Sequence, residues 1–201
     1  MDRSISNAPR AVAGGCGCVD RRMVLRGLVC TALVPTALVP TALAPTALYA
    51  ADNPPPQADD IRFMRMALAE AARADFPFGA VIVRDGDVIA RGRNLGRTRH
   101  DPTAHGEMVA IRNAVAGPGS KALRGATLYT TGEPCAMCMG AIIWCHIGRV
   151  VFAASVEQLA TVMDQIMITG AEIAARASFA PMQITGGVLA DEAMVLFRKK
   201  R

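Results

Sequence analysis

From residue 59 onward, the apolar positions recur with periods that predict regular secondary structure. In the first stretch, residues 59–75, they are spaced three or four apart, as on one face of a helix. The spaced residues are Ile61, Met64, Leu68 and Ala71. The next stretch, 78–94, has two apolar runs on either side of Asp85-Gly86, a pair that favours the tight turn of a β-hairpin.

Helical and strand patterns alternate after the predicted hairpin. Helical patterns cover 105–115, 134–147 and 190–201, and short apolar runs that predict strands cover 126–131, 149–155 and 182–189. The stretch between residues 156 and 177 is predicted to be mostly helical or irregular. Alternation of this kind places helices on both faces of one mixed sheet. We therefore predict a single α/β domain over residues 59–201.

The first 50 residues have a different pattern. They contain a five-residue repeat (TALVP, TALVP, TALAP, TALYA), whose prolines at every fifth position prevent a stable helix. Arg21-Arg22 precede an uncharged run over 27–51, which ends in small residues near Ala50. This order of positive, apolar and small residues is typical of an export signal, and the arginine pair resembles the twin-arginine type.

We predict that residues 1–50 form this export signal, that 51–58 form a proline-rich linker, and that the working domain is periplasmic or secreted. Once the signal is cleaved, the domain would have no membrane contact. Two alternatives remain open: the uncharged run could stay as a membrane anchor, or the leader could be a disordered tail.

Charge argues against a strongly basic nucleic-acid binder. The chain has 22 Lys and Arg against 17 Asp and Glu, but five of the bases and only two of the acids lie in the leader. The remainder has a net charge close to zero, whereas a nucleic-acid-binding domain usually carries a marked basic excess. We therefore expect a small-molecule substrate and no stable nucleic-acid partner.

Three residues beyond the leader form a candidate metal site. Cys135 and Cys138 are spaced as C-A-M-C at the start of a predicted helix, and His105 opens another. One histidine and two thiolates are suitable ligands for a tetrahedral Zn²⁺ whose fourth position takes water. Glu107, two residues after His105, can take a proton from that water without ligating the metal. The alternatives are a redox C-x-x-C pair, a disulfide or a chance arrangement, and a redox pair would leave the His105-Gly106-Glu107 stretch unexplained.

The two motifs, "HGE" and "PCAMC", lie 30 positions apart from His105 to Cys135. Together with "FPFGAVIVRDG", "DPTAHGEMVAIRNA" and "GRVVFAAS", they resemble the purine branch of the cytidine-deaminase-like superfamily, which includes guanine and tRNA adenosine deaminases. The resemblance implies a three-layer α/β/α sandwich, one zinc per subunit and a homodimer. It also implies His105, Cys135 and Cys138 as ligands and Glu107 as proton shuttle.

Four further residues are candidates for substrate contact. Asn94 lies where this branch places an amide that binds the purine ring, although asparagine is also common in turns. Gly106 stands between His105 and Glu107, where the family usually has alanine. We expect its backbone N–H to remain available for substrate contact and the smaller side chain to leave a little more room in the pocket. Trp144, six residues after Cys138, matches a feature of guanine deaminases, or else it is a residue of the hydrophobic core. Asp164, with apolar neighbours, is the candidate carboxylate for the donor edge of guanine, or else a capping or surface residue.

Three hypotheses about function follow. The first is a deaminase of a free purine base, most simply guanine to xanthine and ammonia. The second is a deaminase of tRNA adenosine, which export would disfavour because tRNA is cytoplasmic, or of another nucleoside or cytosine. The third is a zinc-binding domain of the same fold without enzymatic activity.

Overall fold

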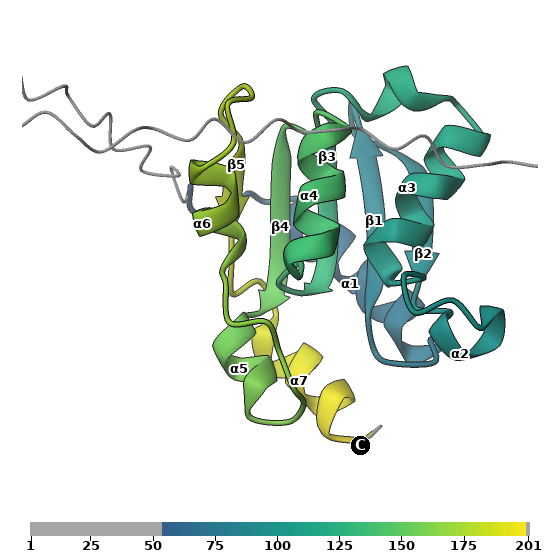
Figure 1. The fold of residues 1–201 in the computed structure, drawn as a ribbon, viewed down its shortest axis with the longest axis vertical. Coiled ribbons are helices and arrows are strands. Elements are labelled where there is room, and N and C mark those ends of the chain that lie inside the picture. The colour runs from purple at the N-terminus through teal and green to yellow at the C-terminus, as the bar shows by residue number, and fades with distance from the viewer. Residues whose placement is uncertain (1–53, 200–201) are drawn as a thin grey trace, which may run out of the picture. The chain divides into compact units, whose positions relative to one another are not determined.

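The computed structural model describes residues 54–199. The predicted export signal and the first part of the predicted linker lie outside the described residues. Five strands form one mixed sheet in the order β2-β1-β3-β4-β5 (Figure 1). The strands are β1 (Gly79–Arg84), β2 (Asp87–Arg93), β3 (Thr127–Gly132), β4 (Arg149–Ala154) and β5 (Gln183–Thr185).

One strand of this sheet, β1, is antiparallel to the other four. β1 is antiparallel to both β2 and β3, whereas β3, β4 and β5 are parallel to one another. Thr130 lies at the centre, paired with Ala80 of β1 and with Phe152 of β4. Since β2 and β3 are both antiparallel to β1, they end at the same edge of the sheet. The helices that follow these two strands therefore begin near one another.

Helices cover both faces of the sheet, as the alternating pattern predicts (Figure 1). α3 (Gly106–Ala116), α4 (Ala136–Trp144) and α6 (Gly170–Ala175) pack on one face; α1 (Asp60–Ala72), α5 (Val156–Ala160) and α7 (Ala190–Lys199) pack on the other. The short helix α2 (Gly96–Arg99) and the 3-10 turn η1 (Ser120–Leu123) complete the described elements. This arrangement confirms the predicted α/β fold.

Alternate residues of each strand enter separate hydrophobic layers, as the pleat of a strand requires. In β1, Ala80 and Ile82 contact the α3 and α4 side, whereas Val81 and Val83 face α1 and α7. All positions of β4 are buried, because helices lie on both of its faces. The sheet is therefore a rigid platform with side chains fixed on both sides.

Local details differ from the predicted pattern at the start of α1. Ile61 is 45% exposed, and the buried stripe instead begins at Phe63 and Met64. Asp60 has no exposed surface and forms a bidentate ion pair with Arg149 of β4, with both N–O distances 2.8 Å. Tyr129 also donates a hydrogen bond to Asp60 at 2.9 Å. This buried network joins α1 to the sheet at the edge opposite the ends of β3 and β4.

Within residues 54–199, we find no helix with the length and apolar character needed to cross a membrane.

Candidate metal centre

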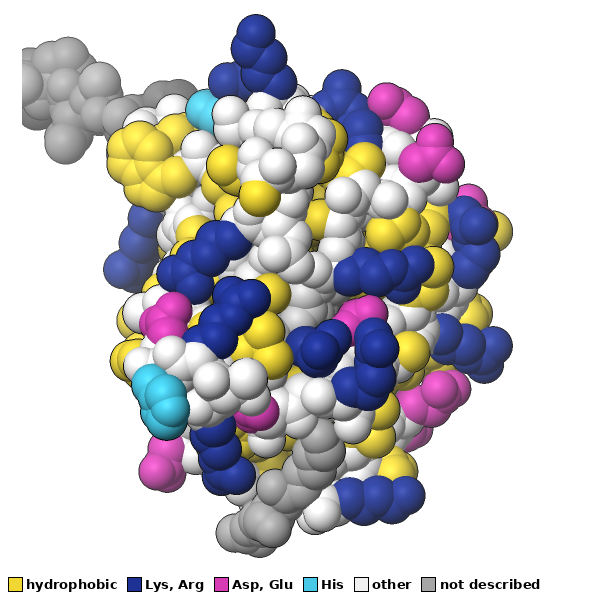
Figure 2. Space-filling view, turned by 90° about the vertical axis from the view of Figure 1, so that its right-hand side faces the viewer, with side chains coloured by type: hydrophobic (Ala, Val, Ile, Leu, Met, Phe, Trp, Pro, Cys, Tyr) yellow, Lys and Arg dark blue, Asp and Glu magenta, His cyan; other side chains and the backbone are white. Residues whose placement is uncertain are grey.

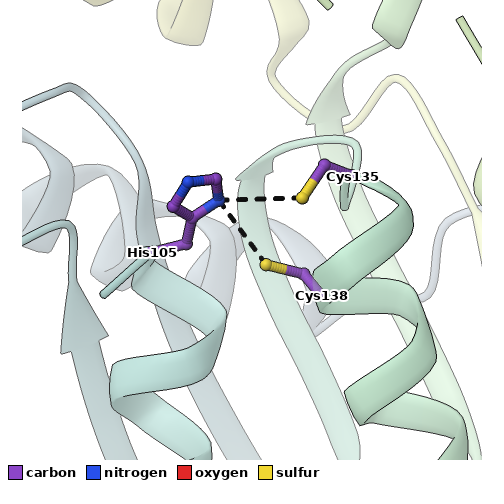
Figure 3. Close-up of side chains that lie close together, drawn as sticks. All are labelled: His105, Cys135 and Cys138. Carbon is purple, nitrogen blue, oxygen red and sulfur yellow. Dashed lines mark hydrogen bonds between the residues drawn. The ribbon is translucent and has the colours of Figure 1, made fainter. Parts of the chain in front are cut away.

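The three candidate ligands meet where α3 and α4 begin. His105 is the N-cap residue of α3 and Cys135 is the N-cap residue of α4, with Cys138 in the first turn of α4. His105 Nδ1 lies 3.7 Å from Cys135 Sγ and 3.7 Å from Cys138 Sγ (Figure 3). The shared sheet edge on which β2 and β3 end therefore brings together residues that are 30 positions apart in the chain.

These distances fit a single tetrahedral Zn²⁺. Zn–S and Zn–N bonds of usual length place ligand atoms about 3.6 Å apart across a tetrahedron. The ligand atoms of all three residues lie within 4.8 Å of one another, so one ion can contact all of them. One imidazole and two thiols are also the donor set that Zn²⁺ prefers. The residues present thus fit zinc and leave its fourth position to a non-protein ligand.

Hydrogen bonding within the cluster changes the protonation of its members. The hydrogen bond with Cys138 lowers the pKa of Cys135 to about 4. The same contact and burial raise the pKa of the Cys138 thiol far above its usual range. Contact with Cys135 raises the pKa of His105. Cys135 is therefore already a thiolate at neutral pH, which is the form that binds metal.

Glu107 lies beside the ligands but is held by another group. Only 2% of its surface is exposed, and Thr130 at the centre of the sheet donates a hydrogen bond of 2.9 Å to Oε1. Oε2 lies 3.6 Å from Cys138 Sγ. Burial raises the pKa of this carboxyl group. One oxygen is thus fixed to the sheet while the other faces the metal cluster.

A cavity of about 390 Å³ opens next to this cluster. Its lining includes His105, Glu107 and Cys135, and two of the predicted substrate contacts, Asn94 and Asp164. Further lining residues are Phe76, Phe78, Pro102, Glu133, Met137, Met163, Gln165 and Ile166. The volume lies near the lower end of the range of about 300–1,000 Å³ for small-molecule sites.

Asn94 and Asp164 differ in how firmly they are held. Asn94 is 4% exposed and its Oδ1 accepts a hydrogen bond from Gly96 N at 3.1 Å. Asn94 therefore forms the local turn and also lines the cavity, and its contact with a purine ring stays a prediction. Asp164 is exposed, in the irregular segment between α5 and α6. It lies on the cavity wall rather than deep inside it.

The structure does not bring Trp144 or Gly106 into the cavity wall of this chain. Trp144 is 74% exposed at the last position of α4 and packs edge-on against Phe179, with ring centroids 5.1 Å apart. Six residues of helix carry it about 9 Å along the axis from Cys138, away from the metal cluster. A Cβ on Gly106 would lie 2.8 Å from the Phe78 carbonyl oxygen. The expected extra room in the pocket is therefore wrong, since backbone fills that space.

Two residues of the site were missed by the sequence reasoning. The Phe78 ring stacks on His105 with an interplanar angle of 8° and ring centroids 6.2 Å apart. Glu133 follows β3 directly, is 8% exposed and lines the cavity. The only local signal for Glu133 is its position just before Pro134-Cys135. Its partners lie more than 20 residues away, where sequence patterns do not reveal them.

Comparison with known proteins identifies the family. The sequence profile described as "Cytidine and deoxycytidylate deaminase zinc-binding region" matches residues 57–154, which contain every candidate ligand. The tRNA-specific adenosine deaminase of Haemophilus influenzae is 38% identical over 158 residues, which are 71% of this chain and 85% of that protein. The chain belongs to the cytidine deaminase family. Its cofactor is therefore zinc, at a site whose three candidate ligands already converge.

Other members of the cytidine deaminase family are similar over shorter or more divergent stretches. The guanine deaminase of Bacillus subtilis is 53% identical over 78 residues, which are 39% of this chain and 50% of that protein. The chain covers 7% of the chloroplastic tRNA(adenine(34)) deaminase of Arabidopsis thaliana and 64% of the tRNA-specific adenosine deaminase of Aquifex aeolicus. It thus spans less than two thirds of these three relatives.

Solved structures of the family agree with this fold. A structure from a study of A-to-I editing by tRNA:A34 deaminases has a TM-score of 0.59 and 35% identity, covering 67% of this chain and 98% of that one. The guanine deaminase of Nitrosomonas europaea has a TM-score of 0.60 and 26% identity, covering 79% and 93%. Both kinds of deaminase are therefore found among similar structures, and the substrate must be argued from the site.

Proposed function

We propose that this chain is a hydrolytic deaminase of a free purine base, with guanine as the preferred substrate and xanthine and ammonia as products. One observation carries the proposal: a single small cavity is lined by two of the three candidate zinc ligands, His105 and Cys135, and also by Glu107, Asn94 and Asp164. The rings of Phe76 and Phe78 line the same cavity, which suits a flat heterocycle.

The reaction replaces an amine by a carbonyl oxygen. The oxygen of water bonds to the ring carbon that bears the amine, the C–N bond breaks, and the amine leaves as ammonia. When bound, zinc lowers the pKa of water and so supplies a nucleophile near neutral pH. Glu107 supplies the proton transfers: Oε2, on the metal side, takes one proton of water and passes it to the ring nitrogen, where it stays. The carboxylate then takes the second proton from the newly bonded hydroxyl and passes it to the amine, so that ammonia leaves as the carbonyl forms. Thr130 holds Oε1 and so fixes the orientation.

Hydrogen-bonding capacity favours guanine over adenine. Guanine presents two donors, N1–H and the amino group, whereas adenine has an acceptor at N1. A carboxylate accepts from both donors, and Asp164 is a carboxylate of the cavity lining whose side chain is exposed and so open to a ligand. The side-chain oxygen of Asn94 is bound to Gly96, so its NH₂ group is the part that can donate to a ring acceptor.

Similarity also supports a purine base, but it gives reason to keep a second candidate. The Bacillus guanine deaminase shares 53% identity, yet the Haemophilus tRNA deaminase matches a larger share of this chain. Many Lys and Arg side chains lie on the face shown in Figure 2, which is the right-hand side of Figure 1, where β2 and α3 lie. Some are in ion pairs, as Arg93 is with Glu70 and Arg112 with Asp101. Deamination of adenosine in tRNA is therefore the second candidate.

Ammonia release from a panel of substrates tests the proposal. The purified full chain, loaded with zinc, is given guanine, adenine, cytosine, their nucleosides and a tRNA anticodon stem-loop. We expect guanine to react fastest. Faster release from another base or a nucleoside contradicts the guanine assignment, faster inosine formation in the stem-loop supports the second candidate, and no release from any substrate contradicts deaminase activity.

Asp164→Ala tests base recognition within the same assay. Loss of a hydrogen bond to a charged acceptor lowers transition-state binding by about 2 kcal/mol, or about 30-fold in kcat/KM. Asp191→Ala removes an exposed carboxylate in the first turn of α7 and is the matched control. Zinc content, measured by elemental analysis, should stay unchanged in both. Equal kcat/KM for guanine in the two variants would assign another group to this contact.

Two further proposals concern the whole protein. We propose that residues 1–50 direct export and are removed, so that the enzyme acts in the periplasm or outside the cell without a stable nucleic-acid partner. We also propose a homodimer, as in the resemblance described above. Light scattering at micromolar concentration measures the molar mass in solution, and the mass of a monomer would contradict the homodimer.

A further inference from the structure

One buried carboxylate at the cavity has no part in the proposed chemistry. Glu133 follows the last residue of β3 and precedes Pro134-Cys135, and its own N–H donates to the Ala154 carbonyl at 2.7 Å. Each of its two side-chain oxygens accepts one backbone hydrogen bond. Val156 N donates to Oε2 at 2.9 Å, and Gly170 N donates to Oε1 at 2.8 Å.

The two donors are the first residues of α5 and α6. Backbone N–H groups in the first turn of a helix have no partner within that helix. Ser155 and Thr169 cap the third residues, Gln158 and Glu172, through complete capping boxes. Glu133 satisfies the first N–H group of both helices and thereby joins two separate elements through one side chain.

The segment between these elements is the part of the cavity wall that carries the proposed base contact. Residues 161–169 connect α5 to α6 and include Asp164, Gln165 and Ile166, all of which line the cavity. Asp164 is exposed, and Ile166 is 58% exposed. Packing therefore holds Asp164 and Ile166 only weakly, whereas Val162 and Met163, next to α5, pack against the core. The rest of the segment depends on the helix that begins at its other end.

We infer that Glu133 is a positioning residue: it holds the start of α6, directly after segment 161–169, and the start of α5, the helix that leads into this segment, and so sets the place of Asp164 over the cavity. The inference rests on the proposed function, because it assigns the segment a role in binding the base. When one or both of these helix starts are released, the segment spends less time in the binding position, and apparent affinity falls in proportion to that fraction. Zinc ligands and Glu107 lie on other elements and stay in place.

Two variants remove the hydrogen bonds from Val156 and Gly170 to Glu133 in steps. Glu133→Ala removes both acceptors. Glu133→Gln keeps one acceptor, but its NH₂ group meets the second backbone N–H and cannot accept from it. Glu157→Gln changes an exposed glutamate in the first turn of α5 and is the matched control.

Hydrogen exchange of the full, zinc-loaded chain reports how firmly α5, α6 and the segment between them are held, and it needs no substrate. We expect peptides covering residues 156–172 to exchange about ten-fold faster in Glu133→Ala, with an intermediate change in Glu133→Gln and none in Glu157→Gln. Zinc content should stay at one ion per chain in all three. If Glu133→Ala does not fold, faster or unchanged exchange in Glu133→Gln still decides between the two outcomes.

Kinetics on the base that the wild type deaminates fastest then measure the consequence. We expect KM to rise about five- to ten-fold in Glu133→Gln while kcat changes less than about two-fold. Unchanged exchange, or a loss confined to kcat, overturns the inference while an active wild type sustains the proposed function. A wild type that deaminates no base overturns both, even if the exchange pattern changes as expected.

Discussion

Glu107→Gln separates metal binding from catalysis. The substitution keeps the size of the side chain and its carbonyl oxygen, which can still accept the 2.9 Å hydrogen bond from Thr130. It replaces the oxygen that lies 3.6 Å from Cys138 Sγ with an NH₂ group. That group cannot take a proton from water, so the transfer proposed for Oε2 is lost while the three candidate ligands are untouched.

The size of the effect follows from the role that is removed. A positioned general acid or base contributes about 10²–10⁴-fold in rate. Because Glu107 handles more than one proton transfer and is 2% exposed, bulk buffer has poor access to replace it. We therefore expect kcat to fall by about 10⁴-fold, or about 5.4 kcal/mol of transition-state stabilisation. KM should change little.

Metal analysis and ammonia release on the same preparation check this prediction. Elemental analysis should find one zinc per chain in wild type and variant, and ammonia release from guanine should fall to the detection limit in the variant alone. Glu157→Gln, at an exposed site in α5, controls for the change of charge. An empty metal site in Glu107→Gln, or kcat within ten-fold of wild type, would refute the division of roles between Glu107 and the ligands.

Other predictions concern the ligand, the buried ion pair and export. His105→Ala should lose both zinc and activity, as measured by elemental analysis and ammonia release, because two thiolates alone hold the ion weakly. Asp60→Asn leaves Arg149 buried with a poorer partner and should lower the free energy of unfolding by about 3 kcal/mol in urea. Burial acts to raise the pKa of Asp60, but its hydrogen bonds, chiefly from Arg149, lower it overall. Its stabilising effect is therefore present above the unfolded value near 4 and is lost at lower pH, so the difference between wild type and Asp60→Asn should narrow there. Changing Arg21 and Arg22 to lysine should keep full-length protein in the cytoplasm, and cell fractionation that finds the wild type there with its N-terminus intact would contradict export.

The fold and the metal cluster were predictable because their signals are local. Strand and helix periods repeat within a few residues, and the motifs around His105 and Cys135 each lie at the start of one helix. That the two motifs meet follows from the order and direction of the strands, which the alternation of elements already restricts. The predicted zinc cofactor and mixed α/β sheet are accordingly confirmed.

The cavity wall was less predictable because distant residues build it. Glu133 is recognisable only through Val156 and Gly170, which follow 23 and 37 positions later. Trp144 lies in an apolar run close to Cys138, yet the turn of the helix directs it elsewhere. The segment after Val156 has no clear period, since its two helices are five and six residues long. Contacts of this kind depend on how loops close, which local patterns do not encode.

The position of the ligands at helix starts has a consequence for folding. α5 and α6 begin with complete capping boxes, whereas at α3 and α4 the N-cap places are taken by His105 and Cys135, and within the described residues neither side chain caps its helix. A missing cap costs about 1 kcal/mol of helix stability. A zinc ion bound to both residues would fasten the two unprotected helix starts to each other, closing a loop of about 30 residues much as a cross-link does. Removal of zinc by a chelator should therefore loosen the first turns of α3 and α4 before the rest of the domain. The thermal stability of the protein would then depend on how much zinc is available to it.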